Sequence, residues 1–291
     1  MTELDNFKTT IIAKSKVTQG VYISNYKKLR DLIQDEDIAS VSQRRVIDVV
    51  QTIDNRNSQQ ALINIAYIIR KKEGLAIQEL EAFRKKNQEL LKAKIYETNT
   101  KLIEKLPSYS ALVDYTNSLL KAKKYIQYVI NYLLLYYQVR NADLVFDFVL
   151  LKKDTKDDTK NYLYYNARTK IVHYIRNVYK TAKIVKPDGT TTGYGQKIIK
   201  ISDPVFIRVI RILAKEQRKQ NTPIVFLPNS DNYHIKKVTY EGLGETMYFK
   251  IVVAHFRSDP NMLKQISYNR GTDINTILES YDLESEPIKK D

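Results

Sequence analysis

Cysteine is absent from the 291 residues, and histidine occurs only three times, as His173, His234 and His255. Without thiols the chain can form neither a disulfide scaffold nor a thiolate metal site. The three histidines show neither an HxxxH nor an HExxH spacing. We therefore expect no zinc enzyme, and no metal or small-molecule cofactor of any other kind.

Glycine is also scarce, with 8 residues in the whole chain. Dinucleotide-binding fingerprints and Walker loops both need closely spaced glycines, and neither pattern occurs. Long apolar runs are missing as well: the most apolar stretch, residues 128–137, is about half as long as a membrane-spanning helix. The N-terminus has no basic segment followed by an apolar core. We expect a buried helix at 128–137 and a soluble, intracellular protein without a membrane partner.

Acidic residues are too few to balance the basic ones, with 33 Asp and Glu against 48 Lys and Arg, a formal net charge of +15. Such a surplus favours a polyanionic partner, and nucleic acid is the commonest. A soluble basic protein from an AT-rich genome, in which Lys, Ile, Asn and Tyr codons are frequent, would have a similar composition. Charge and chain organisation together favour nucleic-acid binding.

The length of the chain predicts two domains. Helical periodicity marks residues 22–33, 41–53 and 58–70, and the charged segment 75–106 fits a surface helix or a helical connector. Pro107 disfavours helix at the residue before it, so we place the boundary there, between 1–106 and 107–291. 

The second half combines helices with short strands. A helical block at 111–144 precedes strand-like runs at 145–151, 161–165, 171–179 and 197–201, and helices resume from Pro204 to 219 and at 245–257, 261–269 and 273–281. Because the strands are grouped and do not alternate with helices, a doubly wound parallel sheet is not expected. The predicted fold is mainly α with a small antiparallel β-sheet.

The segment YLLLYYQVRNADL, residues 132–144, resembles the first catalytic-arginine motif of the tyrosine recombinases. That motif has an apolar helix, a turn, an arginine and an acidic residue three positions later, here Arg140 and Asp143. The spacing places both side chains on one helical face, where the carboxylate would orient the guanidinium. An ordinary surface ion pair after a core helix would have the same spacing.

The segment RGTDINTILESY, residues 270–281, is similar to the end of the same family. There a Gly-His pair precedes the nucleophilic tyrosine, which follows the histidine by nine residues. Here Gly271 is followed by Thr272 in the histidine place, and Tyr281 lies nine positions later. Tyr281 is also one of 22 tyrosines, so its position alone is not distinctive.

Two further family features have weaker counterparts. The family's catalytic lysine lies in a β-hairpin, and the run IRNVYKTAK at 175–183 resembles that hairpin, with Lys180 as first candidate and Lys183 as second. A hairpin that contacts phosphates without catalysis fits equally well. The family's His-x-x-Arg motif aligns with MYFK, which puts Met247 in the histidine place and Lys250 in the arginine place.

The resemblance implies a helical core-binding domain at 1–106 and a tyrosine-recombinase-like catalytic domain, an architecture shared with topoisomerase IB, at 107–291. It implies that Tyr281 attacks a DNA phosphodiester and forms a phosphotyrosyl link. Arg140 and Lys250 would hold the phosphate, Lys180 would protonate the leaving oxygen, and Thr272 would donate a hydrogen bond. Further DNA contacts are expected from five other side chains: Arg176, Lys183, His255, Arg257 and Arg270.

Several functions fit these residues. One is an active recombinase or a related DNA strand transferase. Another is a catalytically inactive DNA-binding or architectural protein, because lysine in an arginine place loses the bidentate fork and both histidine places are substituted. A third is a basic scaffold that binds RNA or protein. For the first two the partner is double-stranded DNA, on which copies of the chain would assemble, and family analogy with mobile elements and large DNA viruses suggests host cytoplasm, host nucleus or virion as the location.

Overall fold

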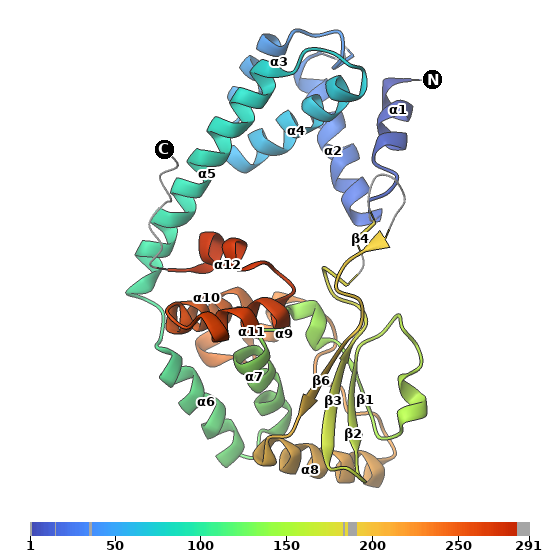
Figure 1. Ribbon diagram of the computed structural model, residues 1–291, viewed down its shortest axis with the longest axis vertical. Helices are drawn as coiled ribbons and strands as arrows, with labels where there is room; N and C mark the ends of the chain where they lie inside the picture. The colour runs from blue at the N-terminus through green and yellow to red at the C-terminus, as the bar shows by residue number, and fades with distance from the viewer. Residues whose placement is uncertain (1, 15, 35–36, 183, 186–190, 284–291) are drawn as a thin grey trace. The chain divides into compact units, whose positions relative to one another are not determined.

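The computed structural model describes residues 2–14, 16–34, 37–182, 184–185 and 191–283 (Figure 1). Over these residues the fold is mainly α with a small sheet, which confirms the predicted fold class. The chain divides into two compact units, the first reaching Glu97 and the second beginning at Thr98. This division falls inside a long helix, upstream of the Leu106–Pro107 position predicted as the boundary.

The first unit contains α1 (Glu3–Thr10), α2 (Lys16–Leu32), α3 (Gln43–Gln51), α4 (Arg56–Lys72) and most of α5 (Gln78–Ile103). Side chains at helical spacing, such as Tyr26, Leu29 and Ile33, are buried in its core. The helices predicted at 22–33, 41–53 and 58–70 correspond to α2, α3 and α4, and the charged segment is α5.

In the second unit α7 (Tyr125–Tyr137) packs against α6 (Tyr109–Lys121), α8 (Pro204–Gln220), α10 (Glu245–Phe256) and α11 (Pro260–Arg270). The unit also contains α9 (Asn232–Lys236), α12 (Ile274–Tyr281) and the short 3₁₀ turns η1 (Asn141–Leu144), η2 (Lys152–Thr155) and η3 (Tyr240–Gly242). Every residue of α7 from Tyr128 to Leu135 is buried, which confirms the predicted buried helix. No helix among the described residues is long and apolar enough to cross a membrane.

The sheet of the second unit has the order β1-β2-β3-β6, formed by β1 (Asp147–Val149), β2 (Tyr162–Asn166), β3 (Ile171–Arg176) and β6 (Lys197–Ile201). Two short strands, β4 (Ile184–Val185) and β5 (Thr191–Thr192), lie between β3 and β6 in the chain. The pairs β2–β3 and β3–β6 are antiparallel, but β1 runs parallel to β2, so the sheet is mixed and not wholly antiparallel as predicted. The connection through η2 is long enough for the crossover that a parallel pair needs.

Alternation along β3 and β6 places one set of side chains against the helical core. Val172, Tyr174, Ile199 and Ile201 belong to this core, and α8 packs on β2 and β3. At the other end of the two strands, the positions on this same inward face are occupied by Arg176 and Lys197, which lie opposite each other in the sheet. The fold therefore brings two buried cations to one end of the sheet, where the candidate site lies.

Candidate active site

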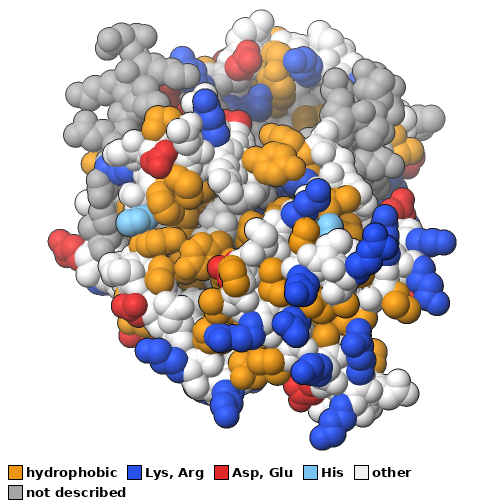
Figure 2. Space-filling model, turned by 60° about the horizontal axis from the view of Figure 1, so that its bottom comes forward, with side chains coloured by type: hydrophobic (Ala, Val, Ile, Leu, Met, Phe, Trp, Pro, Cys, Tyr) orange, Lys and Arg blue, Asp and Glu red, His pale blue; other side chains and the backbone are white. Residues whose placement is uncertain are grey.

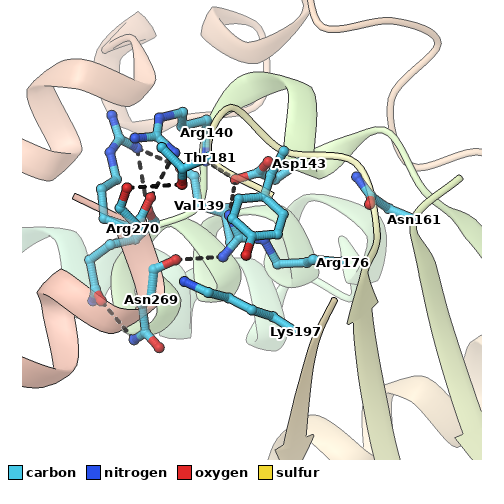
Figure 3. Close-up of polar contacts among 12 residues, drawn as sticks. Val139, Arg140, Asp143, Asn161, Arg176, Thr181, Lys197, Asn269 and Arg270 are labelled. Atoms are coloured by element: carbon cyan, nitrogen blue, oxygen red, sulfur yellow. Dashed lines mark hydrogen bonds and ion pairs between the residues drawn. The ribbon is translucent and has the colours of Figure 1, made fainter. Parts of the chain in front are cut away.

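Arg140 is positioned by the end of α7. Gln138 adopts a left-handed backbone conformation with φ 46° and ends the helix, and Arg140 follows in extended backbone before η1. Its guanidinium donates from Nη1 to the carbonyl oxygen of Arg270 at 2.7 Å and from Nη2 to Thr272 Oγ1 at 2.9 Å (Figure 3). The structure thus brings two sequence-predicted residues, Arg140 and Thr272, into direct contact. Burial, followed by the nearby charge of Arg270, lowers the pKa of the Arg140 guanidinium.

Asp143 does not orient the Arg140 guanidinium, so this part of the sequence interpretation is wrong. Residues 141–144 form a 3₁₀ turn, in which Asp143 Oδ2 accepts from the backbone N–H of Arg140 at 2.9 Å. The same oxygen accepts from Nη2 of Arg176 at 2.5 Å, in an ion pair whose side chains are 1% and 0% exposed. The acidic residue of the motif therefore pairs with the cation at the end of β3.

Arg176 was expected to contact DNA, but its side chain is wholly enclosed. Besides the pair with Asp143, its Nη1 donates to the carbonyl oxygen of Asn269 at 2.5 Å, and its guanidinium lies 4.7 Å from the ring centroid of Tyr179. Arg176 therefore joins β3, η1 and α11, and its enclosed side chain is not available to contact DNA at the protein surface. Its Nε and Asp143 Oδ1 have no hydrogen-bond partner among the described residues.

Lys197, which sequence interpretation did not select, is the second buried cation. Its side chain is 2% exposed, its Nζ donates to the carbonyl oxygen of Tyr268, and the rings of Tyr179, Tyr194 and Tyr268 lie 5.1, 4.7 and 4.6 Å from it. Burial lowers its pKa to about 8, and the neighbouring charges of Arg176 and Arg140 act in the same direction. An ammonium with such a pKa can release a proton near neutral pH.

Arg270 was also expected to contact DNA, and it too is buried. Its guanidinium forms an ion pair with Glu245 and donates to the carbonyl oxygens of Gln138 and Val139 at 3.3 and 3.2 Å. These contacts hold the end of α11 against the end of α7. We call Arg140, Asp143, Arg176, Lys197, Glu245, Arg270 and Thr272 the Arg140 cluster.

The connection between β3 and β6 reaches the Arg140 cluster through Thr181. Thr181 Oγ1 donates to the carbonyl oxygen of Gly271 at 2.9 Å, between Arg270 and Thr272. Lys180 of the same connection is exposed and lines a pocket of about 590 Å³. The other residues lining the pocket are Arg140, Ala142, Asp143, Val145, Phe146, Asp147, Thr159, Lys160, Asn161, Val178 and Tyr179. Arg140 and Lys180, the first arginine and the first lysine selected from the sequence, thus line the same pocket.

Tyr281, the last residue of α12, lies beside this cluster but not in the pocket lining. Its ring packs edge-on against Phe249 with centroids 4.7 Å apart, and the Arg270 guanidinium lies 5.9 Å from its centroid. Because Arg140 donates to the Arg270 carbonyl, Arg270 connects the predicted phosphate-binding arginine to the predicted nucleophile. No hydrogen bond of the Tyr281 hydroxyl exists among the described residues.

The remaining predicted residues lie elsewhere or outside the described part of the chain. Lys250 is buried and donates to Asn99 Oδ1 at 2.5 Å, and burial lowers its pKa. His255 is exposed and stacks on Tyr109 at 4.2 Å, whereas Arg257 pairs with Asp282 at 3.4 Å. These contacts join the three side chains to Asn99, Tyr109 and Asp282 and not to Arg140. Lys183 lies outside the described residues.

Inward strand positions could have identified Lys197 and the burial of Arg176. In KIIKI, residues 197–201, alternation places Lys197, Ile199 and Ile201 on one face, and a lysine on a core-facing position is unusual. The same argument applies to Arg176 after Val172 and Tyr174. Which groups pair with these cations follows only from the tertiary fold.

Over the described residues, no group of three His, Asp or Glu side chains is arranged to hold a metal ion. No protein-family model, no curated protein and no solved structure matches the chain.

Proposed function

We propose that this protein binds double-stranded DNA and cleaves and rejoins its strands through a phosphotyrosyl link at Tyr281, as tyrosine recombinases do. The observation that supports this most directly is the charge of the Arg140 cluster. Four cationic side chains, Arg140, Arg176, Lys197 and Arg270, are accompanied by only two carboxylates, Asp143 and Glu245. A partly buried surplus of positive charge next to an open pocket suits a phosphodiester anion.

In the proposed reaction the Tyr281 oxygen forms a bond to phosphorus while the bond from phosphorus to a sugar oxygen breaks. The tyrosine proton passes to solvent, and the departing oxygen takes a proton from a lysine ammonium. We assign this role to Lys197, whose pKa is lowered to about 8 and whose Nζ would have to leave the carbonyl oxygen of Tyr268 to reach the DNA. Arg140 would hold the non-bridging oxygens, with Thr272 keeping its guanidinium in place.

A non-catalytic DNA-binding function is the alternative, and particular contacts favour it. Two of the five N–H groups of the Arg140 guanidinium, one on each Nη, already donate within the protein. Tyr281 does not line the pocket, and Lys250, aligned with the family's second arginine, is bound to Asn99. Cleavage therefore requires Tyr281 and Lys250 to change their contacts when DNA binds, whereas backbone binding alone does not.

The two functions are separated by trapping a covalent adduct. Nicked duplexes with a randomised core are incubated with the protein, and linked DNA is recovered after denaturation and sequenced. We expect an adduct with the natural chain, none with Tyr281→Phe, and an undiminished adduct with Tyr233→Phe, which alters an exposed tyrosine outside the cluster. DNA binding without an adduct supports the non-catalytic alternative, and absence of both binding and adduct contradicts the two functions together.

The pH profile of adduct formation tests the proton donor. If Lys197 protonates the leaving oxygen, the rate falls as pH rises through about 8, because the lysine then loses the proton that it donates. Lys197→Gln should lower the rate by about 10²–10⁴, the contribution of one positioned acid. Lys200→Gln, which alters an exposed lysine of the same strand, is the control, and an equal loss in both variants would contradict the role of Lys197 as the proton donor.

A further inference from the structure

The outward face of α8 carries charge of one sign. Five of its side chains are basic and exposed, and only one is acidic, Glu216, whose carboxylate accepts from Gln220. The basic residues are Arg208, Arg211, Lys215, Arg218 and Lys219. At about 100° of turn per residue they fall within roughly a 100° arc, opposite the buried residues Phe206, Ile210 and Leu213. None of the five forms an ion pair within the described part of the chain.

Another helix of the same chain shows that this pattern is not the general surface composition. Along α5, six Lys and Arg are mixed with four Glu, as on a helix that faces solvent. Five like charges on one face of α8 repel one another unless an anionic partner or counterions neutralise them. Figure 2, in which the α8 end of Figure 1 comes forward, shows Lys and Arg gathered over this face with few Asp or Glu among them.

This stripe is remote from the Arg140 cluster. Strand β6 begins at the cluster with Lys197 and runs to Ile201, roughly 13 Å away, and α8 starts only after Asp203 caps its N-terminus. Figure 1 shows α8 crossing that far end of the sheet. A phosphate bound at Arg140 therefore cannot also neutralise the charges on α8.

We infer that the outward face of α8 binds the phosphate backbone of a second duplex, separate from the DNA proposed to bind at the Arg140 cluster. The stripe from Arg208 to Lys219 is about 16 Å long, a length of duplex that carries roughly ten phosphates. Three of its five cations are arginines, whose planar forks match phosphate oxygens. An anionic membrane is a poorer partner, because the apolar face of α8 is buried in the core and cannot insert among lipids.

Capture of one duplex by another tests this second surface. A duplex is immobilised, the full-length protein is added, and binding of a fluorescent duplex of different sequence is measured. The natural chain should retain the fluorescent duplex, and Arg208→Gln/Arg211→Gln/Arg218→Gln should reduce its capture at least about tenfold. Glutamine has a helix propensity close to that of arginine, so α8 is expected to stay intact.

A charge-matched variant controls for net charge. Lys152→Gln/Lys153→Gln/Lys156→Gln also removes three charges, from exposed positions in and beside η2. It should leave capture within about twofold of the natural chain, since these lysines are not on α8. Equal losses of capture in both triple variants would overturn the inference. Unchanged capture in the α8 variant would also overturn it, and would leave an acidic protein as the better partner for α8.

The inference goes beyond the proposed reaction and fails separately from it. In an Arg140→Gln background, residual binding of a single duplex should still depend on the three α8 arginines. Capture with no covalent adduct would contradict only the cleavage reaction, and an adduct without capture would contradict only the second surface. Sedimentation of the protein–DNA complex shows whether one copy holds both duplexes, and capture that requires two copies counts against the inference.

Discussion

At the scale of single residues, Asp143 carries the carboxylate that pairs with Arg176, one of the buried cations. Its carboxylate pairs with Arg176 and accepts from the backbone of Arg140, and neither side chain of the ion pair is accessible to solvent. Removing one partner of such a pair leaves the other charged and desolvated, which costs much more than the pair contributes. The arrangement at the end of β3 therefore relies on one carboxylate.

Asp143→Ala should lower the free energy of unfolding by about 3–5 kcal/mol, as expected when a buried ion pair loses one partner. Asp147→Ala is the matched control: it removes a carboxylate paired with Lys160 at 3.1 Å, but the two side chains are 53% and 56% exposed. Chemical denaturation should show a large shift for the first variant and little change for the second. Similar small shifts in both would mean that Arg176 finds another partner or is hydrated.

Residue-scale interpretation of the sequence was partly successful. The motif spacing selected Arg140 and Thr272, which are in contact, but assigned Asp143 to the wrong guanidinium. Local spacing cannot reveal that choice, because Arg176 lies 33 positions from Asp143 and reaches it only through the sheet. The hairpin resemblance favoured Lys180 and Lys183, whereas Lys197 is distinguished by strand alternation, which places it on the inward face of β6.

At the scale of elements, Gly271 is the point at which two connections meet. One is the turn between α11 and α12, and the other is the segment between β3 and β6. Gly271 has φ +64°, and a Cβ there would overlap Thr181 Oγ1 and lie 3.4 Å from Lys197 Nζ. A side chain would therefore add steric overlap to the cost of the left-handed backbone. The close approach requires glycine at this position.

Gly271→Ala should destabilise the protein more than Gly74→Ala, measured as the shift in the denaturation midpoint. Gly74 has φ +70° with no atom within 4 Å of an added Cβ, so its substitution reports only the backbone term, about 1–2 kcal/mol. Thr181→Ala in the Gly271→Ala background should recover part of the difference, since the overlapping oxygen is gone. Equal effects of the two glycine substitutions would indicate that the connection moves aside without cost.

The elements themselves were largely predictable from periodicity. Apolar residues at helical spacing located α2, α3 and α4, and β6 has the predicted bounds. The parallel pairing of β1 with β2 was not predictable, because it depends on how residues 150–161 return the chain to the start of β2. Long-range pairing is decided by packing of the whole unit, which no local pattern contains.

At the scale of the whole molecule, the net charge of +15 sets how DNA binding should respond to salt. Each phosphate neutralised by the protein releases condensed counterions, which makes log K fall by about 0.9 per tenfold rise in salt. The α8 stripe offers five cations to the backbone of one duplex, so its affinity for duplex DNA should fall by about 10²–10³ between 50 and 200 mM salt. Fluorescence anisotropy of a labelled duplex measures this slope.

A duplex with an uncharged methylphosphonate backbone provides the control, since base edges and groove shape remain while the phosphate charge is removed. The protein should bind it weakly and with little salt dependence, because released counterions no longer drive association. A flat salt response with the natural duplex would contradict both DNA-binding proposals, whatever the outcome of the adduct assay. A steep slope that is reduced by about 2–3 in the α8 triple variant would instead assign three of the neutralised phosphates to that helix.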